Sequence, residues 1–375
     1  MSALNVDPQL VKRVLIINVT RIGDTILATP AIRAIAMHFP NADITCLGHP
    51  KRYTVLENLP YLSKVGSVTK KSAWLRGWRD ASPVGAPEYD IAFVWGQDAA
   101  LIHYACRKAK LVVAERHQDE SVNVKLALAF DAPPRNQLHA VAWYLAMIQA
   151  AGVAHHQYSL DYVVTKSERD AAGFKLQSAL GGVNFPTIGF QVASFATKAY
   201  RDWPIARFIE LGLRIVQQHR DARFVCFGAP SDSERIDALS RALRDRVLNF
   251  AGSTSLRESV AIMSYLDLFV GIDTGPTHLF SALKKPMVVL YHPTIPSALY
   301  KPINHPAFSA IDHPLAGPTC RTRISMDEIG VETVWQAVSR ALDGDGSLLP
   351  GMASPGIDAG VAPWPGDDLP MAPSV

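Results

Sequence analysis

An apolar run in the second half of the chain ends in a turn whose groups could bind an anion. The turn and the residues just after it supply a carboxylate, hydroxyls and an imidazole: Asp273, Thr274, Gly275, Pro276, Thr277 and His278. Gly275 permits a tight turn or a close approach of backbone to a ligand, and Pro276 suits a first helical turn. The free N–H groups of that helix would favour a phosphate, and His278 could add a proton or a hydrogen bond. The alternative is an ordinary strand-to-helix turn capped by Asp273 or Thr274.

A second candidate site follows the first predicted strand, in the stretch VTRIGDTILATP at residues 19–30. Gly23 would let the backbone turn sharply after the strand. The carboxylate of Asp24 would then project from the carboxyl end of that strand, close to Arg21. A carboxylate there could accept a proton from a substrate hydroxyl as a general base. The alternative is that Asp24 caps a helix and Arg21 is an exposed cation. Neither G-x-G-x-x-G nor the G-K-[ST] of a P-loop is present.

A third candidate is the basic stretch SFATKAYRDWP at residues 194–204, which begins with the hydroxyl of Ser194. Lys198 and Arg201 follow the first strand of a second α/β unit. Two cations there would neutralise a diphosphate, and an arginine can do so with paired hydrogen bonds. The alternative is a basic surface loop.

Two further stretches carry weaker signals. FGAPSDSERI, residues 227–236, places Asp232 just past a strand end, where an acid could bind ribose hydroxyls. Alternatively, Ser231 is an N-cap and the acids favour the first helical turn.

KKSAWLRGWRD, residues 70–80, mixes cations with two tryptophans. These residues could bind an anionic sugar or lipid headgroup, although such a run is more often a solvated loop. The histidines show no metal-ligand spacing, so no metal site is expected.

Strands alternate with helices twice along the chain, which predicts two open, mostly parallel α/β units. We expect an N-terminal domain at residues 11–170 and a C-terminal domain at residues 186–342. Because ligands of such sheets bind beyond the carboxyl ends of the strands, the active site should lie in a cleft between the domains. Residues 343–375 are rich in Pro, Gly and small residues without Lys or Arg, which predicts a disordered tail.

The composition fits a large cytoplasmic protein. The chain has 375 residues, 48% hydrophobic and 19% charged, and its net charge of +3 does not indicate nucleic-acid binding. It has no apolar run of the roughly 18 residues that a membrane span needs, and we expect no signal peptide. The scattered cysteines indicate free thiols in a reducing compartment: Cys46, Cys106, Cys226 and Cys320.

Taken together, these motifs resemble glycosyltransferase family 9, best known for the ADP-heptose:lipopolysaccharide heptosyltransferases. The resemblance covers about residues 11–342 and rests on four stretches: RIGDTILATPAIRAI, RDWP, FGAPSDSER and GIDTGPTHLFSALKKPMVVLY. The family implies a GT-B fold, in which two Rossmann-like domains enclose the active site. This agrees with the two α/β units expected from the alternation of strands and helices.

The resemblance also implies roles for individual residues. Asp24 matches the catalytic base, which deprotonates the acceptor hydroxyl for an in-line, inverting attack on the donor's anomeric carbon, without a metal or other cofactor. Asp273, Thr274 and Gly275 would hold the diphosphate and sugar end of the donor, with His278 close by. Positive groups of the second domain would stabilise the departing diphosphate.

The chain departs from the family pattern in places. Where the family often has Lys before Trp-Pro, this chain has Arg201, with Lys198 nearby, and either could neutralise the phosphates. Asp232 stands where well-known members use Glu for the ribose. Adenine contacts would involve the GSTSL stretch at residues 252–256, including Thr254.

The leading hypothesis is therefore an inverting glycosyltransferase that moves heptose from ADP-heptose to an inner-core lipopolysaccharide acceptor. A related transferase with another donor or acceptor, a GT-B nucleotide-sugar epimerase and a non-catalytic nucleotide-binding module remain alternatives. The predicted partners are a nucleotide sugar and a glycolipid, not nucleic acid. A membrane-anchored acceptor would imply peripheral contact with the cytoplasmic face of the inner membrane.

Overall fold

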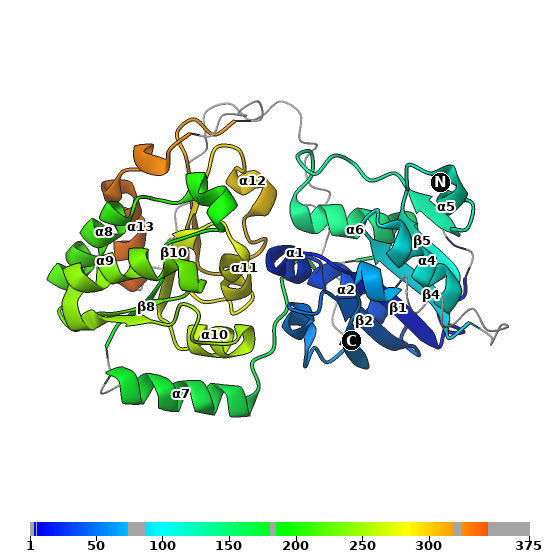
Figure 1. Cartoon of the computed structure of the whole chain (residues 1–375), viewed down its shortest axis with the longest axis horizontal. Coiled ribbons are helices and arrows are strands. Elements are labelled where there is room, and N and C mark those ends of the chain that lie inside the picture. The colour runs from blue at the N-terminus through cyan, green and yellow to red at the C-terminus, as the bar shows by residue number, and fades with distance from the viewer. Residues whose placement is uncertain are drawn as a thin grey trace, which may run out of the picture.

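The protein consists of two α/β domains that lie side by side (Figure 1). The computed structural model describes residues 4, 6–73, 87–155, 157–180, 185–317 and 324–343. Each domain is built on a six-stranded parallel sheet, which confirms the predicted pair of Rossmann-like units. The predicted tail after Asp343 and most of the basic, tryptophan-containing stretch lie outside the described residues.

The N-terminal domain has strand order β3-β2-β1-β4-β5-β6. Its elements are β1 (Arg13–Asn18), α1 (Ile22–Leu27), α2 (Thr29–His38), β2 (Asp43–Gly48), η1 (Tyr53–Leu56), β3 (Lys64–Ser67), β4 (Tyr89–Trp95), α4 (Ala99–Lys108), β5 (Ala109–Glu115), α5 (Glu120–Asn123), β6 (Leu128–Phe130) and α6 (Ala140–Ala150). The order reverses between β1 and β4, so the segments that follow these strands flank the place where such sheets bind ligands.

The C-terminal domain repeats this topology, with strand order β12-β11-β10-β7-β8-β9. Its elements are α7 (Lys166–Leu180), β7 (Thr187–Gln191), η2 (Ala196–Arg201), α8 (Ile205–Gln218), β8 (Arg223–Cys226), η3 (Pro230–Asp232), α9 (Ser233–Leu243), η4 (Arg244–Arg246), β9 (Val247–Asn249), α10 (Leu256–Met263), β10 (Leu268–Ile272), α11 (Gly275–Ser281), β11 (Met287–Tyr291), α12 (Ser297–Tyr300), β12 (Phe308–Asp312), η5 (Met326–Glu328) and α13 (Val331–Leu342). Here the order reverses between β7 and β10.

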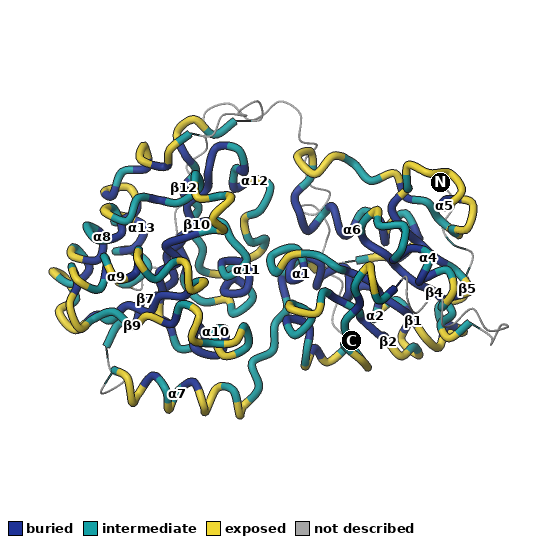
Figure 2. The backbone as a smooth tube through the Cα atoms, viewed as in Figure 1, coloured by how far each residue is buried: buried dark blue, intermediate teal, exposed yellow. Residues whose placement is uncertain are grey.

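The central strands form because their sequences are almost wholly apolar, as expected for strands covered by helices on both faces. Every residue of β10 and β11 is buried, as are all but the first of β1 (Figure 2). The edge strands β3, β6, β9 and β12 are short and less buried, and the sequence did not predict them.

Helix α1 is short because the helical conformation is interrupted between α1 and α2. In the structure α1 ends at Leu27 and α2 starts at Thr29, with Pro30 in its first turn. The hydroxyl of Thr29 donates to the carbonyl of Ile26 at 2.7 Å instead of capping α2. This break leaves α1 as a separate element at the domain boundary.

Helix α7 connects the domains and packs against α10 of the second one (Figure 1). The phenol of Tyr265 donates to the carbonyl of Arg169 in α7 at 2.9 Å. The predicted N-terminal domain ended at residue 170, inside α7, and the exact boundaries stay a prediction.

Other sequence expectations concern cysteines and membrane spans. Cys46, Cys106 and Cys226 are free thiols, and Cys320 lies outside the described residues. Among the helices that the structure describes, none combines the length and apolar character needed to cross a bilayer.

Candidate functional site

Helices α1 and α11 contact each other across the domain boundary (Figure 1). A Cβ atom added to Gly23 would lie 3.0 Å from Cδ2 of His278, and one added to Gly275 would lie 3.1 Å from Cβ of Ile22. Both glycines have helical backbone rather than a positive φ. Gly23 therefore serves a close approach between the domains, not the sharp turn predicted from the sequence.

Asp24 lies in the first turn of α1, where its carboxylate contacts two side chains of its own domain. Its Oδ1 atom lies 3.4 Å from Nη1 of Arg135 and 3.5 Å from the phenol oxygen of Tyr144. The helix begins after Arg21, which is exposed, and no side chain caps it. The alternative that Asp24 merely caps a helix is therefore wrong. The side chain stays 28% exposed, so the carboxylate is accessible from solvent.

Two residues that the sequence did not single out hold this carboxylate. The guanidinium of Arg135 lies 3.5 Å from the ring centroid of Trp143, a cation–π contact that restrains it beside Asp24. Tyr144 is buried, and burial raises the pKa of its phenol, which therefore keeps its proton and can donate to Asp24. Tyr144 lies on α6, and nothing local in the sequence pairs it with residue 24.

Asp273 and His278 form a buried pair at the start of α11. Nε2 of His278 lies 3.3 Å from Oδ1 of Asp273, and both side chains are at most 9% exposed. The Thr277 hydroxyl donates to the carbonyl of Ile272 at 2.6 Å, which ties the helix to the end of β10. Thr274 is the N-cap but makes no capping hydrogen bond through its side chain. The turn is therefore more than an ordinary capped connection, and Pro276 occupies the first helical turn, as predicted.

Tyr300 shows that charged groups of both domains meet in one place. Burial raises the pKa of its phenol, and the carboxylates of Asp273 and Asp24 raise it further. Arg135 and Arg201 act in the opposite direction. Two carboxylates and two guanidinium groups, one of each kind from either domain, therefore act electrostatically on this side chain. Shifted pKa values caused by charges of both domains are typical of a functional site.

The two candidate cations lie in the 3₁₀ turn η2. The guanidinium carbon of Arg201 lies 5.5 Å from the ring centroid of Tyr200, and Nζ of Lys198 lies 5.8 Å from it. The hydroxyl of Ser194 donates to the carbonyl of Lys198 at 2.9 Å, so Ser194 holds the turn in place. The charge of Arg201 also lowers the pKa of Tyr300, the side chain on which Asp273 acts in the opposite direction.

Asp232 and Thr254 lie in neighbouring loops on the other side of the C-terminal switch point from α11. Oδ2 of Asp232 accepts the backbone N–H of Ala229 at 2.8 Å, and the Ser231 hydroxyl donates to Oδ1 at 3.3 Å. The carboxylate thus closes its own turn, and Ser231 is not an N-cap, because α9 begins at Ser233. The hydroxyl of Thr254 lies 2.8 Å from that of Ser259.

Comparison with known proteins assigns the family. Residues 83–323 match the model of glycosyltransferase family 9, described as heptosyltransferases. The chain belongs to glycosyltransferase family 9. It is 20% identical to the lipopolysaccharide heptosyltransferase 3 of Escherichia coli over 282 residues, which are 72% of this chain and 80% of that protein.

Solved structures of family 9 proteins share the fold. The glycosyltransferase of Veillonella parvula gives a TM-score of 0.75 at 19% identity and covers 90% of this chain and 99% of its own. The E. coli ADP-heptose lipopolysaccharide heptosyltransferase II gives 0.69 at 19% identity, with 89% and 99% covered. The predicted GT-B architecture is thereby confirmed.

A second interdomain contact of this family 9 enzyme involves a histidine that was not predicted as a site residue. Nδ1 of His139, at the start of α6, accepts the backbone N–H of Val141 at 3.2 Å. The proton is therefore on Nε2, which donates to the carbonyl of Lys301 in the other domain at 2.8 Å. Burial lowers the pKa of His139 to about 4.

Within the described ranges, no group of three or more His, Cys, Asp or Glu side chains could hold a metal ion.

Proposed function

We propose that this family 9 glycosyltransferase moves heptose from ADP-heptose to an inner-core lipopolysaccharide acceptor, with inversion and with Asp24 as general base. The observation that carries the proposal is the position of Asp24 on α1, next to Gly23, which packs against His278 of the Asp273–His278 pair on α11. The donor assignment is supported by the likeness to the E. coli structure, which is that of an ADP-heptose lipopolysaccharide heptosyltransferase.

In the proposed reaction, the N-terminal domain binds the acceptor and the C-terminal domain binds the donor. The acceptor hydroxyl gives its proton to Asp24 and its oxygen attacks the anomeric carbon of the donor. The bond from that carbon to the diphosphate breaks on the opposite face, so the configuration inverts and ADP leaves. Arg135 and Tyr144 hold Oδ1 of Asp24, which fixes the carboxylate for proton transfer.

The C-terminal domain would bind the donor. Asp273, Thr274 and Gly275 hold its sugar and diphosphate end beside His278, while Asp232 and Thr254 lie where the nucleoside would be bound. We assign neutralisation of the departing diphosphate to Arg201, because its charge acts within the same cleft as Asp273, with Lys198 in support.

The acceptor of such an enzyme is a membrane-anchored glycolipid. We therefore propose that the protein works at the cytoplasmic face of the inner membrane through peripheral contact. Binding to vesicles that contain the acceptor, with acceptor-free vesicles as the control, tests this part separately.

The decisive experiment compares the wild type with Asp24→Ala and Asp24→Asn. We expect transfer from ADP-heptose to stripped inner-core glycolipid to fall by about 10²–10⁴-fold, because the general base is lost. The Kd of ADP, measured by calorimetry, should change less than twofold. Near-normal transfer by Asp24→Asn would refute the base assignment. Product only with another nucleotide sugar would refute the donor, and turnover without acceptor would indicate an epimerase.

A further inference from the structure

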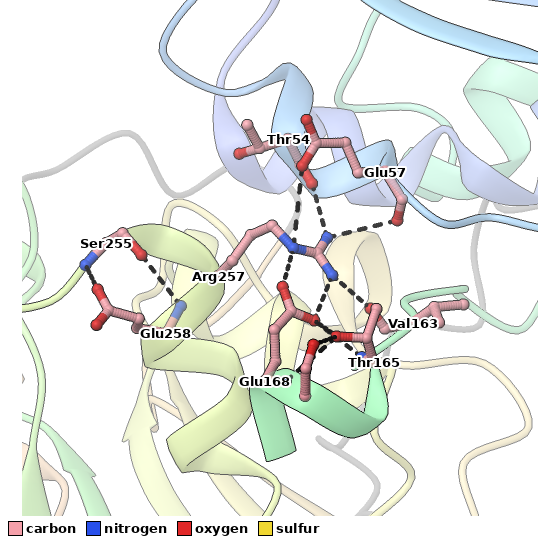
Figure 3. Close-up of polar contacts among 9 residues, drawn as sticks. Thr54, Glu57, Val163, Thr165, Glu168, Ser255, Arg257 and Glu258 are labelled. Carbon is pink, nitrogen blue, oxygen red and sulfur yellow. Dashed lines mark hydrogen bonds and ion pairs between the residues drawn. The ribbon is translucent and has the colours of Figure 1, made fainter. Parts of the chain in front are cut away.

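The side chain of Arg257, three positions after Thr254, joins the two domains (Figure 3). It lies on α10, its side chain is 13% exposed, and its guanidinium points out of the C-terminal domain toward η1. Nη1 donates to the carbonyl of Thr54 at 3.0 Å and to that of Glu57 at 3.4 Å, both in the N-terminal domain. Nη2 donates to the carbonyl of Val163, in the connecting segment, at 2.8 Å.

The remaining donors of this guanidinium bind one carboxylate. Nε and Nη2 form a bidentate pair with Glu168 at the start of α7, the second bond measuring 2.8 Å. The hydrogen bond from Arg257 lowers the pKa of Glu168 to about 2. The backbone N–H and the hydroxyl of Thr165 each donate to the same carboxylate at 2.8 Å. All five N–H groups of the arginine thus have acceptors.

The Arg257 cluster (Arg257 with Thr54, Glu57, Val163 and Glu168) therefore ties three parts of the chain together. Figure 1 shows α10 and α7, which carry Arg257 and Glu168, below helices α1 and α11, and α6 and α12 above them. The hydrogen bond from His139 to the carbonyl of Lys301 joins the start of α6 to the residue after α12. Rotation of one domain away from the other would break the bonds from Nη1 to the carbonyls of Thr54 and Glu57, while the pair with Glu168 would remain. A partly buried guanidinium that loses two acceptors is destabilised, so the cluster favours the arrangement in which the domains touch.

We propose that Arg257 is a positioning residue that sets how Asp24 in one domain faces the donor site in the other. This rests on the proposed function, because it assigns the base and the donor to different domains. Reacting atoms must come within about 3–3.5 Å in the right orientation, and a displacement of about 1 Å can reduce the rate about 100-fold. A residue that fixes the angle between the domains therefore affects the chemical step without touching either substrate.

The test measures the domain arrangement and the reaction separately. The variants are Arg257→Met, Arg257→Lys and Glu168→Gln, with Arg214→Met as the matched control. Arg214 also pairs with carboxylates, those of Glu210 and Glu332, but wholly within the C-terminal domain. Thermal melting shows first that each variant is folded.

Spin labels report the domain arrangement. They are placed at Met37→Cys on α2 and Leu213→Cys on α8, both exposed, after replacement of Cys106 and Cys320 by serine. We expect Arg257→Met to broaden the distance distribution between the labels and Arg214→Met to leave it unchanged. This readout does not depend on any activity.

Kinetics report the positioning. We expect Arg257→Met to lower kcat about 10- to 100-fold while the Kd of ADP changes less than twofold, with a smaller loss of kcat for Arg257→Lys and Glu168→Gln. An unchanged distance distribution, or a loss of rate explained by weaker ADP binding, would overturn the proposal. Equal losses in Arg257→Met and Arg214→Met would overturn it too. If the wild type transfers no heptose, the proposed function fails, but the distance measurement still tests the domain tie.

Discussion

Replacement of Gly23 by alanine should separate folding stability from transfer. Gly23 is a helical residue of α1, so alanine is conformationally allowed there and should favour the helix by about 1 kcal/mol. Its new Cβ, however, would lie 3.0 Å from Cδ2 of His278 in the other domain. The substitution therefore stabilises helix α1 and disturbs the contact between α1 and α11.

The size of the disturbance follows from the distance. Carbon atoms normally pack at about 3.5–4.0 Å, so the ring of His278 must give way by a few tenths of an ångström. Overpacking of this kind costs about 1–3 kcal/mol. The cost applies only when the domains are in contact, whereas the helix gain applies in every arrangement. At about 1.4 kcal/mol per tenfold, the equilibrium constant for the contacting arrangement falls about 5- to 150-fold.

We therefore expect Gly23→Ala to unfold in urea at the wild-type midpoint or slightly above it, and to lose kcat by about 5- to 100-fold. The assay is transfer to the glycolipid acceptor at saturating donor, combined with urea unfolding followed by circular dichroism. Gly330→Ala serves as the control, because a Cβ there meets nothing within 4 Å. Wild-type kcat in Gly23→Ala would refute the conclusion that this glycine sets the distance between the domains.

Two further predictions concern stability. Burial lowers the pKa of His139 to about 4, so folding opposes its protonation: stability should be full above pH 6.5 and fall by up to about 3 kcal/mol as the pH drops to 4. His139→Gln should flatten this dependence in urea unfolding at several pH values, and an unchanged slope would contradict the assignment. Trp203 is fully buried and its Nε1 donates to the carbonyl of Ile329 at 2.9 Å. Trp203→Phe should cost the C-terminal domain about 1–3 kcal/mol in the same assay, through the unpaired carbonyl, and no loss would exclude this hydrogen bond as a contributor.

The sequence predicted the architecture because the relevant signals are local. Continuous apolar runs such as those of β1 and β10 indicate strands covered on both faces, and their alternation with amphipathic helices indicates parallel sheets. The strand-to-helix turns at Asp24 and Asp273 could also be located, because turn residues and polar groups follow the apolar runs directly. The family resemblance supplied the roles proposed for both.

The sequence did not predict the short edge strands, because they lack such a local signal. β6 and β9 have three residues each, too few for a periodic pattern, and they form because a neighbouring strand offers hydrogen-bonding groups. The same holds for the function of Gly23. A glycine before an acid indicates a turn when the sequence is considered alone, and only the approach of α11 shows why a side chain is excluded.

The sequence alone thus determined two Rossmann-like units and the strand ends where chemistry can take place. The tertiary structure decided which groups meet there. Arg135 lies 111 positions from its partner Asp24, and Arg257 lies 203 positions from the Thr54 carbonyl that it binds. Hydrophobic periodicity records how deeply a residue is buried but not which distant residue lies opposite. Those pairings arise only when the two sheets have formed and the domains have come together.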